Sequence, residues 1–80
     1  MVYFMKELLE YIVKALVDKP EAVSVNEAEK DGGLVLELRV DPDDMGKVIG
    51  KQGRIAKAMR TIIKTAAIRD NIRVTVDIID

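Results

Sequence analysis

Residues 41–60 read DPDDMGKVIGKQGRIAKAMR, and this stretch decides the fold. Asp41 can accept hydrogen bonds from free amides as a helix N-cap, and Pro42 suits the first helical position, where no amide donor is missed. Gly50 is a natural left-handed stop, so the pattern predicts a short helix that ends just before it. A longer helix restarts after Gly53. The sequence therefore predicts two helices joined by a tight glycine loop.

The segments that flank these helices are predicted to be strands. Residues 34–40 alternate between an apolar side and a mostly polar side, which is the two-residue period of a half-buried strand. Residues 72–78 alternate in the same way. Residues 22–30 form a weaker strand pattern, and the turn signal Asp31-Gly32-Gly33 indicates that this segment and residues 34–40 make a hairpin.

The opening segment is predicted to be an amphipathic helix that ends before Lys19-Pro20. Its apolar residues recur at helical spacing and are expected to face the core: Met5, Leu8, Leu9, Ile12 and Leu16. The helix after Gly53 is expected to turn a similar set inward: Ile55, Met59, Ile62, Ile63 and Ala66.

The predicted order is helix, strand, strand, helix, helix, strand. Each long strand has one apolar face, so the three helices must cover a single side of the sheet. A right-handed crossover then places the last strand parallel to residues 34–40. The fold class is therefore α+β, with a three-stranded mixed sheet, and the 80 residues are expected to form a single domain over 1–80.

Composition excludes several classes of function. The chain has no cysteine and no histidine, so thiolate chemistry, the usual zinc sites and a Ser-His-Asp triad are not available. The acids at 41, 43 and 44 fit helix capping better than metal binding. We expect no enzyme activity, cofactor, metal or small-molecule substrate. Because no apolar run or leader pattern is present, we expect a cytoplasmic protein with no membrane partner.

Charge is distributed very unevenly along the chain. Residues 45–69 hold seven basic residues and no acid, whereas the whole chain holds 13 basic and 14 acidic residues. A cationic segment in an acidic remainder focuses a polyanion onto one surface. A solvated helix face with no partner is the alternative explanation at this point.

The loop from Gly50 to Gly53 lies inside this cationic segment. Glycines let the backbone approach a ligand closely, so amides here and at the start of the next helix can contact phosphate oxygens, with Lys51 and Arg54 beside them. The simpler alternative is that Gly50 caps one helix and Gly53 opens the next. The spacing fits neither a Walker loop nor a dinucleotide-binding motif.

Residues 48–55, VIGKQGRI, resemble the signature of the KH domain, Ile-Gly-x-x-Gly-x-x-Ile. The second isoleucine, Ile55, comes one place early, and Ala56 takes the expected position. Residues 44–58, DMGKVIGKQGRIAKA, are closely similar to the KhpA family of small bacterial proteins that consist of one KH domain, and this likeness extends over essentially all 80 residues.

The resemblance implies a type II KH topology and a groove that clamps about four unpaired nucleotides of RNA. The family's backbone clamp corresponds to residues 50–53, with an apolar floor nearest Ile49 and Ile55. With the neighbouring cations, the expected RNA-binding residues are Lys47, Ile49, Gly50, Lys51, Gln52, Gly53, Arg54, Ile55 and Lys57. Aromatic stacking is not expected, because the aromatic residues all fall in the first predicted helix: Tyr3, Phe4 and Tyr11.

The first hypothesis is thus a single-stranded RNA-binding module that acts as an RNA chaperone or regulator of transcripts. The resemblance also implies self-association or pairing with KhpB (Jag), a larger multidomain KH protein, and two linked grooves would raise avidity. The second hypothesis is an assembly module in which RNA contact is secondary. Four alanines of the third helix would permit close packing: Ala56, Ala58, Ala66 and Ala67.

Overall fold

The computed structural model describes residues 5–79 of the chain. Its helices and strands follow the predicted order: α1 (Met5–Leu16), β1 (Ser24–Lys30), β2 (Gly33–Arg39), α2 (Met45–Ile49), α3 (Arg54–Arg69) and β3 (Val74–Ile78). Short 3-10 turns lie at Pro20–Ala22, Pro42–Asp44 and Lys51–Gly53. The α+β prediction is confirmed.

The sheet has the order β1-β2-β3 and is mixed. β1 and β2 form the expected antiparallel hairpin, in which Val25 lies opposite Leu38. β3 is parallel to β2, and Leu36 lies opposite Val76. The chain reaches β3 through α2 and α3, so the predicted crossover connection is confirmed.

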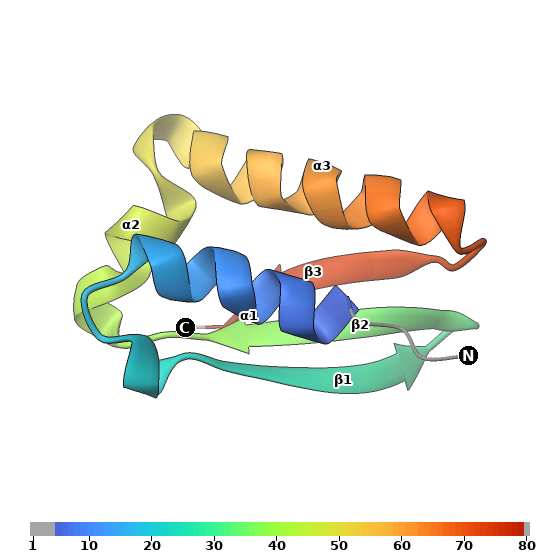
Figure 1. Ribbon diagram of the computed structural model, residues 1–80, viewed down its shortest axis with the longest axis horizontal. Coiled ribbons are helices and arrows are strands. Elements are labelled where there is room, and N and C mark those ends of the chain that lie inside the picture. Colours follow the sequence, from blue (N-terminus) through green and yellow to red (C-terminus); the bar gives the residue numbers. More distant parts are fainter. Residues whose placement is uncertain (1–4, 80) are drawn as a thin grey trace.

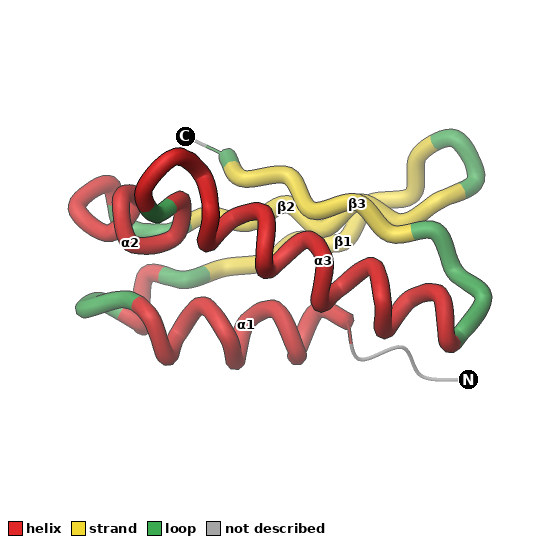
Figure 2. The backbone as a smooth tube through the Cα atoms, turned by 90° about the horizontal axis from the view of Figure 1, so that it is seen from above, coloured by secondary structure: helices red, strands yellow, loops and turns green. Residues whose placement is uncertain are grey.

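All three helices lie on one side of this sheet, and α1 and α3 run along it (Figures 1 and 2). The core lies between the layers. It is built from the buried apolar residues of both: Met5, Leu9, Val13, Val23, Val25, Leu36, Leu38, Val48, Met59, Ile63, Ala67, Val74 and Val76. The alternation in β2 and β3 predicted the sheet half of this core correctly. Among the described helices, none has both the length and the apolar character needed to cross a membrane.

The helix faces differ in part from those predicted. In α3, Ile62 was expected to face the core but is 47% exposed, because the buried stripe runs through Met59, Ile63 and Ala67 at four-residue spacing. In α1, Leu16 is likewise exposed, while Val13, which was not predicted, is fully buried. Periodicity leaves a choice between adjacent apolar positions, and the line of contact with the sheet decides it.

The predicted short helix before Gly50 is divided in two. Asp41 caps it as expected, since its carboxylate accepts a 2.9 Å hydrogen bond from the amide of Asp43. A 3-10 turn at Pro42–Asp44 then precedes α2. The strand expected over residues 72–78 begins at Val74.

The molecule has two distinct ends (Figure 1). α2 and the glycine loop lie at one end. The β1–β2 turn and the connection from α3 to β3 lie at the other. α3 spans the distance between the two ends.

Candidate nucleic-acid interface

The loop between α2 and α3 turns through three residues with positive φ. Gly50 has φ 74° and ψ 177°, Gln52 has φ 58° and Gly53 has φ 73°. The Gly53 amide donates to the Gly50 carbonyl at 3.3 Å, and the Arg54 amide donates to the Lys51 carbonyl. Neither bond uses the amide hydrogens of Lys51 and Gln52.

Gly50 is the position that only glycine can occupy. Its backbone lies in a region that is essentially restricted to glycine. A Cβ added there would lie 2.6 Å from Cγ1 of Ile55, closer than real Cβ atoms come to their neighbours. Gly53, in contrast, has open space around the added atom and needs glycine for its backbone angle alone. The bare backbone at Gly50 therefore allows Ile55 to pack under the loop.

Cationic and apolar side chains surround this backbone. Lys51, Arg54 and Lys57 are exposed, and none of them takes part in an ion pair among the described residues. Ile49 is 37% exposed and Ile55 is half-buried. The structure thus brings these predicted site residues together, with positive charge available to a ligand and an apolar surface next to it.

The basic stripe of α3 lies beside the edge strand β3. Nε of Arg60 donates to the carbonyl of Val76 at 3.3 Å. Lys57 and Lys64 precede and follow Arg60 on the same side of the helix, since they are three and four residues away. These three cations are exposed and form a basic stripe, and the Arg60 contact places this stripe beside β3.

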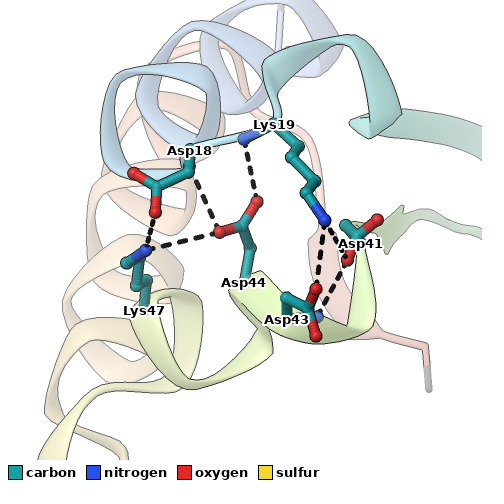
Figure 3. Close-up of polar contacts among 6 residues, drawn as sticks. All are labelled: Asp18, Lys19, Asp41, Asp43, Asp44 and Lys47. Carbon is teal, nitrogen blue, oxygen red and sulfur yellow. Dashed lines mark hydrogen bonds and ion pairs between the residues drawn. The ribbon is translucent and has the colours of Figure 1, made fainter.

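Lys47 is in a different environment from the other predicted site cations. Its ammonium donates to the carboxylate of Asp18 and lies 3.5 Å from Oδ1 of Asp44 (Figure 3). The side chain therefore joins α2 to the end of α1. It is the one predicted RNA contact whose charge is already neutralised within the described residues.

Asp44 is the centre of this junction and is almost completely buried, with 1% of its surface exposed. Its carboxylate accepts hydrogen bonds from the backbone amides of Asp18 at 3.2 Å and Lys19 at 3.0 Å. The sequence predicted a helix-start acid here, but the carboxylate serves the end of α1 instead. The Asp44 carboxylate therefore links the segment after α1 to the segment before α2.

The ionisation of the junction reflects these contacts. Burial raises the pKa of the Asp44 carboxyl, but the amides of Asp18 and Lys19 and the ammonium of Lys47 together outweigh it and hold the pKa below 3.8. The hydrogen bond to Asp18 raises the pKa of Lys47 above 10.5. Both groups are therefore charged at neutral pH.

Lys19 makes a second link at the same place. Its ammonium lies 3.0 Å from Oδ2 of Asp43 and 3.6 Å from Oδ1 of Asp41 (Figure 3). The hydrogen bond to Asp43 raises the pKa of Lys19 above 10.5. The sequence analysis did not predict these ion pairs between the end of α1 and the segment around α2, because partners that lie 22 to 29 positions apart give no local pattern. The only hint was an acid, Asp44, on the side of a short helix that must face the core.

The aromatic residues divide into two groups. Tyr3 and Phe4 lie outside the described residues. Tyr11 is in α1 as predicted and is 76% exposed. Tyr11 therefore belongs to neither the glycine loop nor the basic stripe, which is on α3.

Comparison with known proteins places these features in a family. A family model described as "KhpA/KhpB, KH domain" matches residues 6–78. A protein of Clostridium perfringens named RNA-binding protein KhpA is 64% identical over 94% of this chain and 100% of its own length. RNA-binding protein KhpA of Clostridium acetobutylicum is 61% identical over the same shares, and that of Chlamydia trachomatis is 49% identical over 95% of this chain and 97% of its own.

A solved structure shares the fold. The chain superimposes on Era of Aquifex aeolicus with a TM-score of 0.65 and 18% identity, over 94% of this chain. It spans only 29% of the length of that Era chain. At this identity the likeness concerns the arrangement of helices and strands alone.

Proposed function

The chain belongs to the KhpA/KhpB KH-domain family, and we propose that it binds single-stranded RNA by clamping the sugar-phosphate backbone against residues 50–53. The observation that carries this proposal is the loop itself: a backbone that excludes a Cβ at Gly50, set in a segment with seven cations and no acid. The relatives named as RNA-binding proteins support the choice of ligand.

The loop offers a phosphate two kinds of donor. The amides of Lys51 and Gln52 are not used by the bonds that close the loop, and the first amides of α3 follow directly. The Lys51 and Arg54 side chains add full charges, and charged donors form hydrogen bonds to phosphate about twice as strong as neutral ones. Ile49 and Ile55 supply an apolar surface for a base or ribose.

The proposal is tested by the double variant Lys51→Asp/Gln52→Asp. Aspartate tolerates the positive φ of Gln52, so the fold should persist while two anions occupy the place of the phosphates. We expect affinity for an unstructured oligouridylate, measured by fluorescence anisotropy at low salt, to fall at least tenfold.

A matched control changes the net charge by the same amount elsewhere. Lys14→Glu/Ala15→Glu alters two exposed residues of α1, a different element from the loop and the helix that follows it. This control should retain most of the affinity. Equal loss in both variants would show that only overall charge matters, and unchanged affinity in the loop variant would defeat the clamp.

We propose in addition that the functional unit contains two KH domains, either two copies of this chain or this chain with KhpB (Jag). One groove of about four nucleotides gives little affinity by itself, and two linked grooves raise it. Such a unit would suit an RNA chaperone or a regulator of transcripts.

The second candidate function is an assembly module in which RNA contact is secondary, and the surface of α3 favours it. Ile62 and Ile68 are 47% and 75% exposed on this helix. Of the four alanines expected to permit packing, Ala56 and Ala67 are buried in the chain's own core, which leaves Ala58 as the exposed one and Ala66 as half-buried.

Sedimentation at micromolar concentration, with and without RNA, tests the assembly candidate, because this function requires the chain to self-associate. An assembly module should sediment as a dimer without RNA, and Ile62→Lys should convert it to a monomer. A protein that is monomeric throughout that range would exclude this candidate, whereas the RNA-binding proposal would stand.

A further inference from the structure

An open cavity lies at the opposite end of the molecule from the glycine loop. Its volume is about 750 Å³, within the range of small-molecule sites. It is bounded by the β1–β2 turn, the last turns of α3 and the start of β3. Its lining includes Asp31, Lys64, Ile68, Asn71, Ile72 and Arg73.

From this cavity we infer a second RNA subsite, which holds a nucleotide beyond the four clamped at the glycine loop, on the same strand. The inference rests on the proposed function, because it requires that RNA be bound at residues 50–53. Its ligand class is a nucleotide phosphate with its base or ribose.

The charges in the cavity suit a phosphate. Lys64 and Arg73 both line it, and among the described residues neither takes part in an ion pair. Asp31 is the single acid of the lining, so cations outnumber acids by two to one. An arginine can also bind two phosphate oxygens at once.

Arg73 is held in position before any ligand arrives. Its Cδ lies 3.2 Å from the place where a Cβ of Gly33 would be, so the stem of the side chain packs across the hairpin. Its carbonyl accepts a 2.8 Å hydrogen bond from the amide of Leu34. A cation whose stem is already ordered loses less conformational entropy on binding.

The cavity also has an apolar wall. Ile68 is three-quarters exposed and Ile72 is half-buried, and both line it next to Ala67 and Val74. Such a wall can cover one side of a base or ribose, while Asn71 supplies a polar side chain to the same lining. An apolar wall with a few placed polar and charged groups is the usual composition of a small-ligand site.

The stripe on α3 connects this cavity to the glycine loop. Arg60 contacts the carbonyl of Val76 on β3, and Lys64, one turn further along the helix, lines the cavity together with Val74. From Gly53 to Lys64 the helix rises roughly 16 Å, at about 1.5 Å per residue. A strand clamped at the loop and laid along β3 therefore reaches the cavity without leaving the cationic surface.

The test compares oligouridylates of four and eight nucleotides by NMR titration of the whole chain. The eight-nucleotide strand should bind more tightly and should shift the amides of Lys64, Asn71 and Arg73, which the four-nucleotide strand leaves in place. Lys64→Gln/Arg73→Gln should remove most of the affinity difference, weaken the longer strand's binding much more than the short strand's, and lower the longer strand's slope of log K against log salt by about 1.4.

Two controls separate this inference from its alternatives. Arg69→Gln removes a cation from the last turn of α3 that does not line the cavity, and it should keep the preference for the longer strand. Uridine monophosphate alone should not shift the cavity amides at the concentrations used for the strand.

Four results would overturn the inference. An equal effect per cation removed in Arg69→Gln and in the cavity variant would reduce it to non-specific charge. Shifts of the cavity amides with the monophosphate alone would make it a separate nucleotide site. If the unaltered chain binds neither oligonucleotide, the proposed function itself fails, whereas binding of both strands with equal affinity removes only the second subsite.

Discussion

Lys47 and Lys51 are four positions apart, and the molecule uses them in opposite ways. Lys47 lies in the junction of α1 and α2, where the carboxylates of Asp18 and Asp44 neutralise it. Lys51 lies in the glycine loop, exposed and without an ion pair among the described residues. The two regions meet through α2. The junction holds α2 against α1, and α2 ends where the loop begins.

The difference teaches that a cationic segment is not one surface. A cation that is paired with carboxylates inside the molecule contributes to the fold but attracts an external anion only weakly, because the nearby negative charges cancel its field. Charge that is unmatched at the surface attracts an anion. If the junction and the loop are separable in this way, a substitution in one should leave the property of the other unchanged.

The largest effect is expected at Gly50. The variant Gly50→Ala should lose about 1 to 3 kcal/mol of stability from its backbone angle alone, and Ile55 must also move because of the 2.6 Å contact. RNA affinity should fall with it, since the loop backbone is displaced. Urea denaturation and RNA titration measure the two losses.

Gly46→Ala is the matched control for that variant. Gly46 is in α2, and an added Cβ meets nothing within 4 Å. Alanine is favoured over glycine in a helix, so stability should rise by roughly 0.5 to 1 kcal/mol with affinity unchanged. Equal destabilisation by the two variants would contradict the special role given to Gly50.

A second, smaller effect is expected at Asp44. Its folded-state pKa is depressed below 3.8, so the carboxylate contributes stability that is fully present above pH 3.8 and is lost as the pH falls through the lower folded value. Asp44→Asn should lower stability at neutral pH, because an amide can no longer accept from two backbone donors and pair with Lys47. Thermal unfolding between pH 2 and 7 should show a weaker acid dependence in this variant.

Asp43→Asn controls for the loss of a nearby acid. The Asp43 side chain is 79% exposed, and its partner Lys19 also contacts Asp41. Stability should change little. If Asp44→Asn and Asp43→Asn unfold at the same temperature, the burial of Asp44 adds nothing to the stability of the fold.

The smallest effects compare the two lysines directly. Lys47→Met should lower the denaturation midpoint and leave the salt dependence of RNA binding almost unchanged, because its ammonium is already neutralised. Lys51→Met should leave the denaturation midpoint unchanged and reduce the slope of log K for RNA against log salt by about 0.7. Equal reductions in slope would show that the junction lysine also contacts RNA, as the sequence alone suggested.

Local patterns predicted most of the fold. The alternation through Leu36 and Leu38, and through Val74 and Val76, identified the two central strands and their buried faces, since side chains alternate across a strand. The cap at Asp41 and the glycine loop were also predicted, because each depends on residues within a few positions. The α3 face was less well predicted: Ile62 and Ile63 are adjacent, and only packing against the sheet selects Ile63.

The sequence by itself determined the order of the elements, the mixed sheet, the position of the glycine loop and the excess of positive charge around it. These features arise from short-range periodicity and backbone preference. Contacts between distant segments are what neutralise Lys47, bury Asp44 against two backbone amides, and place Arg60 and Lys64 along β3 toward the cavity at the hairpin end. Such features depend on contacts between segments distant in sequence, and no local pattern records which distant partner a charge will meet.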